Sequence, residues 1–114
     1  MKQDFIVDRL RKARRVVPDF LLSEKLVDDL NSVEFEIPNE MHFDLYLLRF
    51  QQRNKAQELF PVAKSMVDDN VIAILYEPET ISILQLHDFS SGALERSHTF
   101  DEFEDWLKFR QEES

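Results

Sequence analysis

Three apolar runs separated by short polar turns dominate the middle of the chain. The runs cover residues 59–66, 71–76 and 81–86, and polar segments at 67–70 and 77–80 separate them. Connections of this length usually join neighbouring antiparallel strands. The spacing therefore predicts a three-stranded antiparallel meander.

A fourth periodic segment, at residues 99–109, has the spacing of a helix. Its apolar residues recur at intervals of three and four positions, and acidic residues fill most positions between them. The apolar members are Phe100, Phe103, Trp106, Leu107 and Phe109. This pattern predicts an amphipathic helix that covers the sheet, with Ser97 or Thr99 as its N-cap and the acids in its first turn and on its wet face.

The residues before the meander predict two helices and two further strands. Residues 3–16 carry a helical apolar stripe that ends before Pro18, and residues 23–30 carry another, with Ser23 as N-cap. Residues 33–37 alternate apolar and acidic side chains, as a half-buried strand does. Residues 41–50 fit either a strand or a helix, and their bulky side chains favour a strand.

Together these elements predict one domain, residues 1–114, of the α+β class. We expect a mainly antiparallel sheet of about five strands, with N-terminal helices and a C-terminal amphipathic helix covering one side of it. Hydrophobic residues make up 43% of the 114 positions, which is enough for a packed core.

Glycine and cysteine usage removes several classes of function. The chain has one glycine, Gly92, and no cysteine. Phosphate-cradling loops and nucleophile elbows depend on glycine, and thiolate catalysis, disulfides and thiolate metal sites depend on cysteine. The N-terminal residues lack the apolar core of a signal peptide, and no window approaches about 20 apolar residues. We therefore expect a cytoplasmic protein without a membrane segment.

Charge is distributed unevenly along the chain. The first fifteen residues carry a net +4, so the net charge of -9 leaves -13 for the remainder. An acidic body repels nucleic acid and attracts basic protein surfaces, which favours a protein partner with a basic surface. Acids that only keep a small domain soluble would produce the same composition.

The order of motifs resembles the SUKH superfamily, which contains bacterial immunity domains and the eukaryotic Smi cell-wall regulators. The resembling segments are Val17-Pro18-Asp19-Phe20, Phe60-Pro61-Val62-Ala63 and the final helix motif from Thr99 to Leu107. The match lies mainly in residues 59–109, and Val17 stands where leucine is usual in the family. The resemblance implies a SUKH-like fold with no catalytic activity.

For function, the resemblance implies a bacterial immunity protein, that is, an antitoxin that binds and inhibits a toxin. The toxin is often a nuclease and is delivered by neighbouring cells in contact-dependent inhibition. The acidic body agrees with this, because a nuclease surface is basic where it binds phosphates. Two alternatives stay open at this point. One is an intracellular adaptor or regulatory scaffold without a toxin partner, and the other is a small enzyme of unrecognised type.

The contacts of such an inhibitor should be exposed acids and aromatics in turns and at strand ends. The residues that meet this description are Asp68, Asp69, Tyr76, Glu77, Glu79 and Asp88. Acidic groups steer a basic enzyme during encounter, and aromatic groups anchor it.

No catalytic, metal or cofactor site is expected. The best candidate for a metal site joins His87, Asp88 and His98 with Glu95 or Asp101, but these residues lack the close helical pairing of many metal sites. Paired carboxylates are frequent in the sequence, yet acid–base catalysis needs environments that separate two pKa values inside a cleft. Nothing in the pattern buries those pairs.

Overall fold

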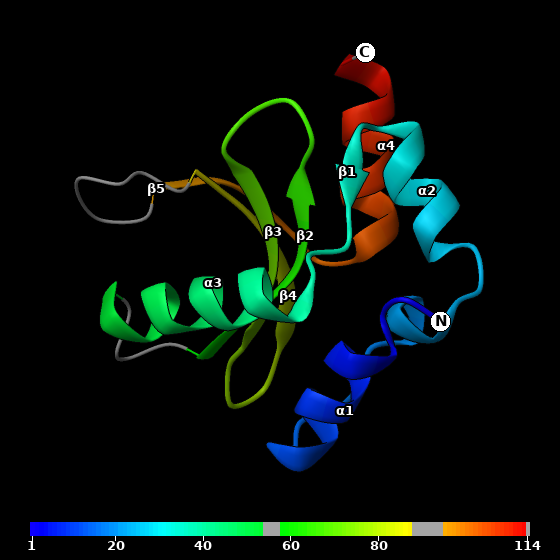
Figure 1. The fold of residues 1–114 in the computed structure, drawn as a ribbon. Helices are drawn as coiled ribbons and strands as arrows, with labels where there is room; N and C mark the ends of the chain where they lie inside the picture. Colours follow the sequence, from blue (N-terminus) through cyan, green and yellow to red (C-terminus); the bar gives the residue numbers. More distant parts are fainter. Residues whose placement is uncertain (54–57, 88–94, 114) are drawn as a thin grey trace.

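The computed structural model describes residues 1–53, 58–87 and 95–113, which form four α-helices, one 3-10 helix and five strands (Figure 1). In chain order the elements are α1 (Asp4–Lys12), η1 (Asp19–Leu22), α2 (Leu26–Ser32), β1 (Phe35–Glu36), α3 (Glu40–Arg53), β2 (Glu58–Ser65), β3 (Asn70–Tyr76), β4 (Ile81–His87), β5 (Glu95–Phe100) and α4 (Phe103–Glu113). The predicted α+β class with a C-terminal amphipathic helix is confirmed.

The strands form one antiparallel sheet in the order β1-β2-β3-β4-β5. The predicted meander is confirmed as β2, β3 and β4. A bulge interrupts the β2–β3 register between Pro61 and Ala63, where a proline that cannot donate a ladder hydrogen bond is tolerated. The central strand β3 is buried along its whole length.

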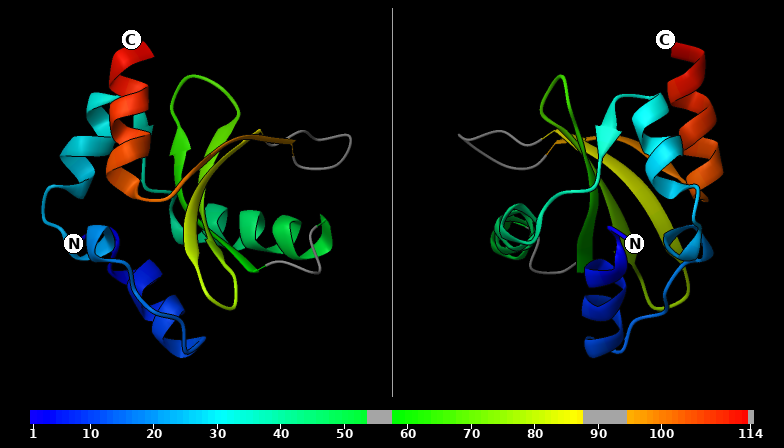
Figure 2. Two further views of the ribbon diagram at one scale, coloured as in Figure 1. Left: turned by 180° about the vertical axis from the view of Figure 1, so that it is seen from behind. Right: turned by 45° about the vertical axis from the view of Figure 1, so that its right-hand side comes forward.

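Burial of β3 on both faces corrects the expectation that helices cover only one side of the sheet. Helices α1, α2 and α4, together with Ile72 and Ile74 of β3, supply much of the larger core, and α3 adds Phe43 and Leu47 to it. Phe50 and Tyr46 of α3 pack on the opposite face, against Ala73 of β3 and its neighbours. The right-hand view of Figure 2 shows α3 on one side of the sheet and the α2–α4 pair on the other.

Helix α3 replaces the strand predicted at residues 41–50. Phe43 and Phe50 are buried, whereas Met41, Leu45 and Leu48 are exposed, and both sets follow helical spacing. Asn39 begins the helix, because its Oδ1 accepts the backbone N–H of His42 at 2.8 Å. The prediction was wrong because apolar residues on two sides of a helix also produce a run that alternates.

Strand β5 was not predicted, and its presence moves the last helix. Thr99 and Phe100 belong to β5, so neither Ser97 nor Thr99 caps α4, which begins at Phe103. The count of five strands survives because the missed β5 offsets the strand wrongly placed at 41–50. Residues 88–94, which precede β5, lie outside the described residues.

The N-terminal helices are shorter than their apolar stripes predict. Helix α1 ends at Lys12. Two residues later Arg14 takes a left-handed conformation (φ 58°), and the N–H of Arg15 donates to the carbonyl of Leu10. Helix α2 begins at Leu26 rather than at Ser23. The turn that follows α2 takes up residues 33 and 34 of the strand predicted at 33–37, and β1 has only two residues.

Trp106 anchors α4 to the sheet. The side chain is fully buried, its Nε1 donates to Oε1 of Gln85 at 2.9 Å, and its ring meets Phe35 edge-to-face with centroids 5.0 Å apart. Gln85 on β4 thus lies on the same face as α4. The core interpretation of the aromatic stripe is confirmed for Phe103 and Trp106.

Candidate functional site

The contact residues predicted from the sequence lie at two opposite ends of the sheet. Asp68 and Asp69 occupy the β2–β3 hairpin, and Glu77 and Glu79 occupy the β3–β4 turn (Figure 1, top and bottom). A strand as long as β3 separates these turns by about 20 Å. All four side chains are exposed, but the structure does not bring the two pairs together into one patch.

Tyr76 is buried, which corrects its prediction as an exposed aromatic contact. Only 8% of the residue is exposed, and its hydroxyl donates to the carbonyl of Val16 at 2.6 Å. Burial raises the pKa of its phenol to about 12, against the opposing charge of Arg15. Tyr76 therefore ties the segment after α1 to the sheet. Asp88, the remaining predicted contact, lies outside the described residues.

The β2–β3 hairpin is braced by its own side chains. Ser65 Oγ accepts the backbone N–H groups of Val67 and Asp68 at 3.1 and 3.2 Å, and Asp68 Oδ1 accepts the N–H of Asn70 at 2.9 Å. Partial burial pushes the pKa of Asp68 upward, but the hydrogen bonds from Asn70 and Ser65 and the charge of Arg110 outweigh it and lower that pKa. The carboxylate is therefore held ionised in a fixed position.

The tip of this hairpin exposes two apolar side chains. Met66 is 47% exposed and Val67 is 64% exposed, directly before Asp68 and Asp69. Single exposed apolar residues are ordinary on protein surfaces. Two adjacent ones on a braced turn beside carboxylates resemble the apolar centre and charged surround of a protein interface.

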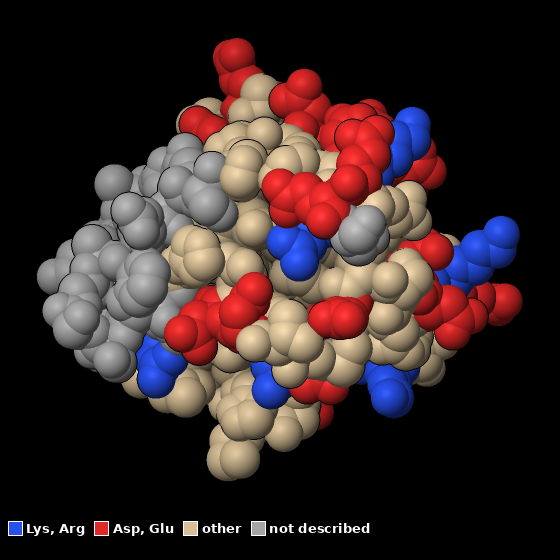
Figure 3. Space-filling model, turned by 90° about the horizontal axis from the view of Figure 1, so that it is seen from above, with Lys and Arg blue, Asp and Glu red and all other residues tan. Residues whose placement is uncertain are grey.

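Further acids surround the hairpin, although they are distant in sequence. We define the upper acidic face by Glu34, Glu36, Asp68, Asp69 and Glu113. Figure 3, which views the molecule from above, shows acidic side chains gathered over the hairpin end of the sheet and the end of α4. The cations Lys64 and Arg110 pair there with Glu36 at 3.3 Å and Glu113 at 3.6 Å, and the face keeps an excess of negative charge.

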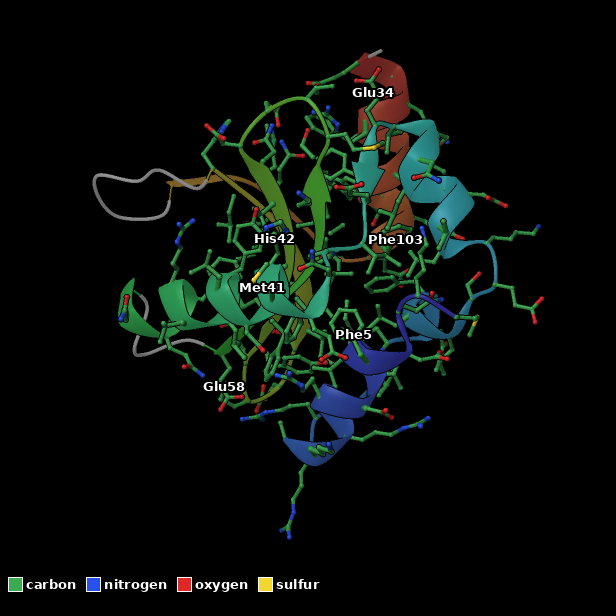
Figure 4. All side chains as sticks on the ribbon, in the orientation of Figure 1. Phe5, Glu34, Met41, His42, Glu58 and Phe103 are labelled. Atoms are coloured by element: carbon green, nitrogen blue, oxygen red, sulfur yellow. The ribbon has the colours of Figure 1, made fainter. Side chains whose placement is uncertain are left out.

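Glu34 joins the hairpin to the junction of α2 and β1, and Figure 4 places it at the upper edge of the molecule. Its carbonyl accepts the N–H of Met66 at 2.8 Å. It also holds a left-handed conformation, φ 63°, that ends α2 and is costly for a residue with a Cβ. A cavity of about 310 Å³ between Glu34, Arg110 and Glu113 completes the face.

Arg110 is the cation at the centre of this arrangement. Its guanidinium lies 5.3 Å from the ring centre of Phe35, and its Nε is buried with no hydrogen-bond partner among the described residues. The guanidinium of Arg110 therefore keeps one hydrogen-bond donor that no described residue accepts, beside the carboxylates of the upper acidic face.

Sequence reasoning missed Glu34, Arg110, Met66 and Val67 as parts of the site. Glu34 and Arg110 carry no local signal, because only the fold places them beside the hairpin. Met66 and Val67 did carry one: a turn that begins with two apolar residues before two acids is unusual for a solvent-exposed loop.

The sequence offered His87, Asp88 and His98 as candidate metal ligands, and Asp88 lies outside the described parts of the chain. No group of three or more His, Asp or Glu residues in the described parts is arranged to hold a metal ion. His98 instead packs against the ring of Phe109, with centroids 4.5 Å apart and the ring planes tilted by 46°.

Comparison of the chain with protein-family models, with curated proteins and with solved structures finds no match. None of the helices in the described ranges combines the length and apolar character that a membrane crossing requires.

Proposed function

We propose that this protein is a non-enzymatic binding protein that docks its upper acidic face onto a basic partner. The partner class that fits best is a toxin domain, such as a nuclease, which this protein inhibits as an immunity protein. The observation that carries the proposal is the braced hairpin, which presents Met66 and Val67 among the carboxylates of the face.

Electrostatic attraction speeds the association of the upper acidic face with a basic partner and makes it selective for such partners. A nuclease concentrates lysine and arginine where it binds the phosphate backbone. A surface with fixed carboxylates is steered toward that region and competes with the nucleic acid for it. Inhibition then requires only coverage of the enzyme's binding surface, and it weakens as salt screens the charges.

Rigidity of the hairpin adds to the affinity. Binding through a flexible loop costs the conformational entropy of ordering that loop. The hydrogen bonds of Ser65 and Asp68 order the turn before the partner arrives. Met66 and Val67 can then lose water at the centre of the interface without that additional cost.

The test uses the protein encoded directly upstream, since an immunity gene is expected next to its toxin gene. The C-terminal domain of that upstream-encoded protein is expressed alone and together with this protein. Cell growth and the affinity between the two proteins are measured. We expect growth arrest by the domain, rescue by co-expression, and at least about 10-fold weaker binding for Asp68→Lys/Asp69→Lys.

A matched control has the same charge change at the other end of the sheet. Glu77→Lys/Glu79→Lys should bind with less than about 3-fold loss, because these residues lie away from the face. Equal losses in both variants would show that net charge rather than this face governs binding. Binding without growth arrest or rescue would favour the adaptor interpretation over the immunity function.

A further inference from the structure

A second surface feature lies at the other end of α4, away from the upper acidic face. It is an open groove of about 440 Å³ between the start of η1, the start of β4 and the start of α4. We call it the η1–α4 groove. Figure 4 shows Phe103, which forms part of it, where α4 begins.

The floor of the η1–α4 groove is apolar. Phe20 and Phe103 stack face to face there, with ring centres 4.5 Å apart and planes within 4°. Pro18, Ile81 and Ile83 complete the floor. Phe20 and Ile81 are only half-buried, so apolar surface stays open to solvent and would gain from being covered.

The rim of the groove is acidic and has no basic member. It consists of Asp19, Asp101, Glu102 and Glu104, all of them exposed. Within the described ranges, none of these four carboxylates has an ion-pair or side-chain hydrogen-bond partner. The helix dipole accounts for an acid in the first turn of α4, such as Glu104. Asp19 comes from a different element, the first turn of η1, and it lines the same opening.

The groove continues along α4 into a second hollow of about 400 Å³. The two share Phe20, Phe103 and Glu104, and the second extends to Leu107 and Lys108. Two adjoining hollows favour a segment of chain over one side chain as the occupant.

We propose that the η1–α4 groove binds a short basic peptide segment of a partner protein, in which one aromatic or large aliphatic side chain is flanked by lysine or arginine. The central side chain covers the Phe20–Phe103 floor. The flanking cations meet Asp19 on one wall and Glu104 and its neighbours on the other.

Charge excludes the main alternatives. Nucleic acid and anionic lipid headgroups would be repelled by the four carboxylates of the rim. A second copy of this chain is disfavoured, because two bodies of net charge -9 repel one another. The chain nevertheless has an exposed Val16 beside Arg14 and Arg15, so self-association is measured as an outcome of the test.

The probe is the acetylated and amidated peptide Lys-Lys-Phe-Lys-Lys, added to the ¹⁵N-labelled full chain and followed by two-dimensional NMR. We expect shift changes at the backbone amides of Phe20, Ile81 and Phe103. The peptides Lys-Lys-Ser-Lys-Lys and Glu-Glu-Phe-Glu-Glu should each bind at least about 5-fold more weakly, since each lacks one of the two interactions. Raising salt from about 0.05 M to about 0.5 M should weaken the first peptide similarly.

Three variants separate this proposal from folding effects and from the proposed function. Asp19→Asn/Glu104→Gln should weaken the peptide at least about 5-fold, with its melting temperature measured in parallel. Ile81→Ala, which trims the floor and leaves the rim charges unchanged, is the second variant if the first unfolds. Asp68→Lys/Asp69→Lys should bind the peptide as the wild type does, because the hairpin lies away from the groove.

Three results would overturn the proposal. One is a serine peptide that binds as tightly as the phenylalanine peptide, and another is shift changes on the upper acidic face instead of the groove. The third is groove shifts that depend on protein concentration without peptide, which would assign the groove to a second copy of this chain.

Discussion

The two faces of the sheet are covered in different ways. On one face, helices from both ends of the chain enclose the larger core around Trp106 and Phe35. On the other, α3 covers a smaller cluster through Tyr46 and Phe50, and it leaves Met41, Leu45 and Leu48 in solvent. An apolar pattern therefore indicates burial only where the residues that pack against it are also known. Four substitutions distinguish the two faces.

Replacing Trp106 by alanine should have the largest effect. The ring is fully buried, packs on Phe35 and bonds to Gln85, so its loss creates a cavity and removes a buried hydrogen bond. We expect the free energy of unfolding to fall by about 4–5 kcal/mol. Trp106 is the only tryptophan, so urea unfolding should be followed by circular dichroism. A loss below about 2 kcal/mol would contradict an anchoring role for Trp106.

Phe50→Ala tests the smaller cluster on the opposite face. Phe50 is 1% exposed and contributes α3's largest fully buried side chain to that cluster. The expected loss is about 3 kcal/mol, measured under the same conditions. If Phe50→Ala destabilised the protein more than Trp106→Ala, the ranking of the two faces would be reversed.

Tyr76→Phe tests the edge of the larger core and its pH dependence. Loss of the hydrogen bond to Val16 should cost about 1 kcal/mol at neutral pH. The pKa of Tyr76 is raised from 10.0 to about 12, so above pH 10 the unfolded chain releases this proton first. The wild type should therefore lose stability as pH rises from 10.0 toward about 12, and the variant should lose less over that window. Parallel wild-type and variant curves would show that Tyr76 is not the titrating group.

Leu48→Gln should have the smallest effect. Leu48 is 50% exposed on the outer side of α3, so the change should stay within about 0.5 kcal/mol. The matched control is Leu47→Gln, because the neighbouring Leu47 packs against the larger core, and it should cost about 1–2 kcal/mol. Equal effects would mean that something covers the outer side of α3 in solution.

The predicted contact residues also separate into features that the sequence shows and features that only the fold decides. The sequence identified the two acidic turns of the meander, because turn chemistry and charge are local features. It could not rank them, since Glu77 and Glu79 resemble Asp68 and Asp69 in the sequence. Only the fold brings Glu34 and Arg110 to one of those turns and buries Tyr76 at the end of β3.

The sequence by itself determined the meander and the presence of an amphipathic helix at the end. In both, the hydrophobic period and the short turns are properties of neighbouring residues. Tertiary structure alone decided that residues 40–53 form a helix, that both faces of the sheet are covered, and that acids from 34, 68 and 113 share one face. The physical reason is that burial depends on what lies across the core, and those partners are distant in the chain.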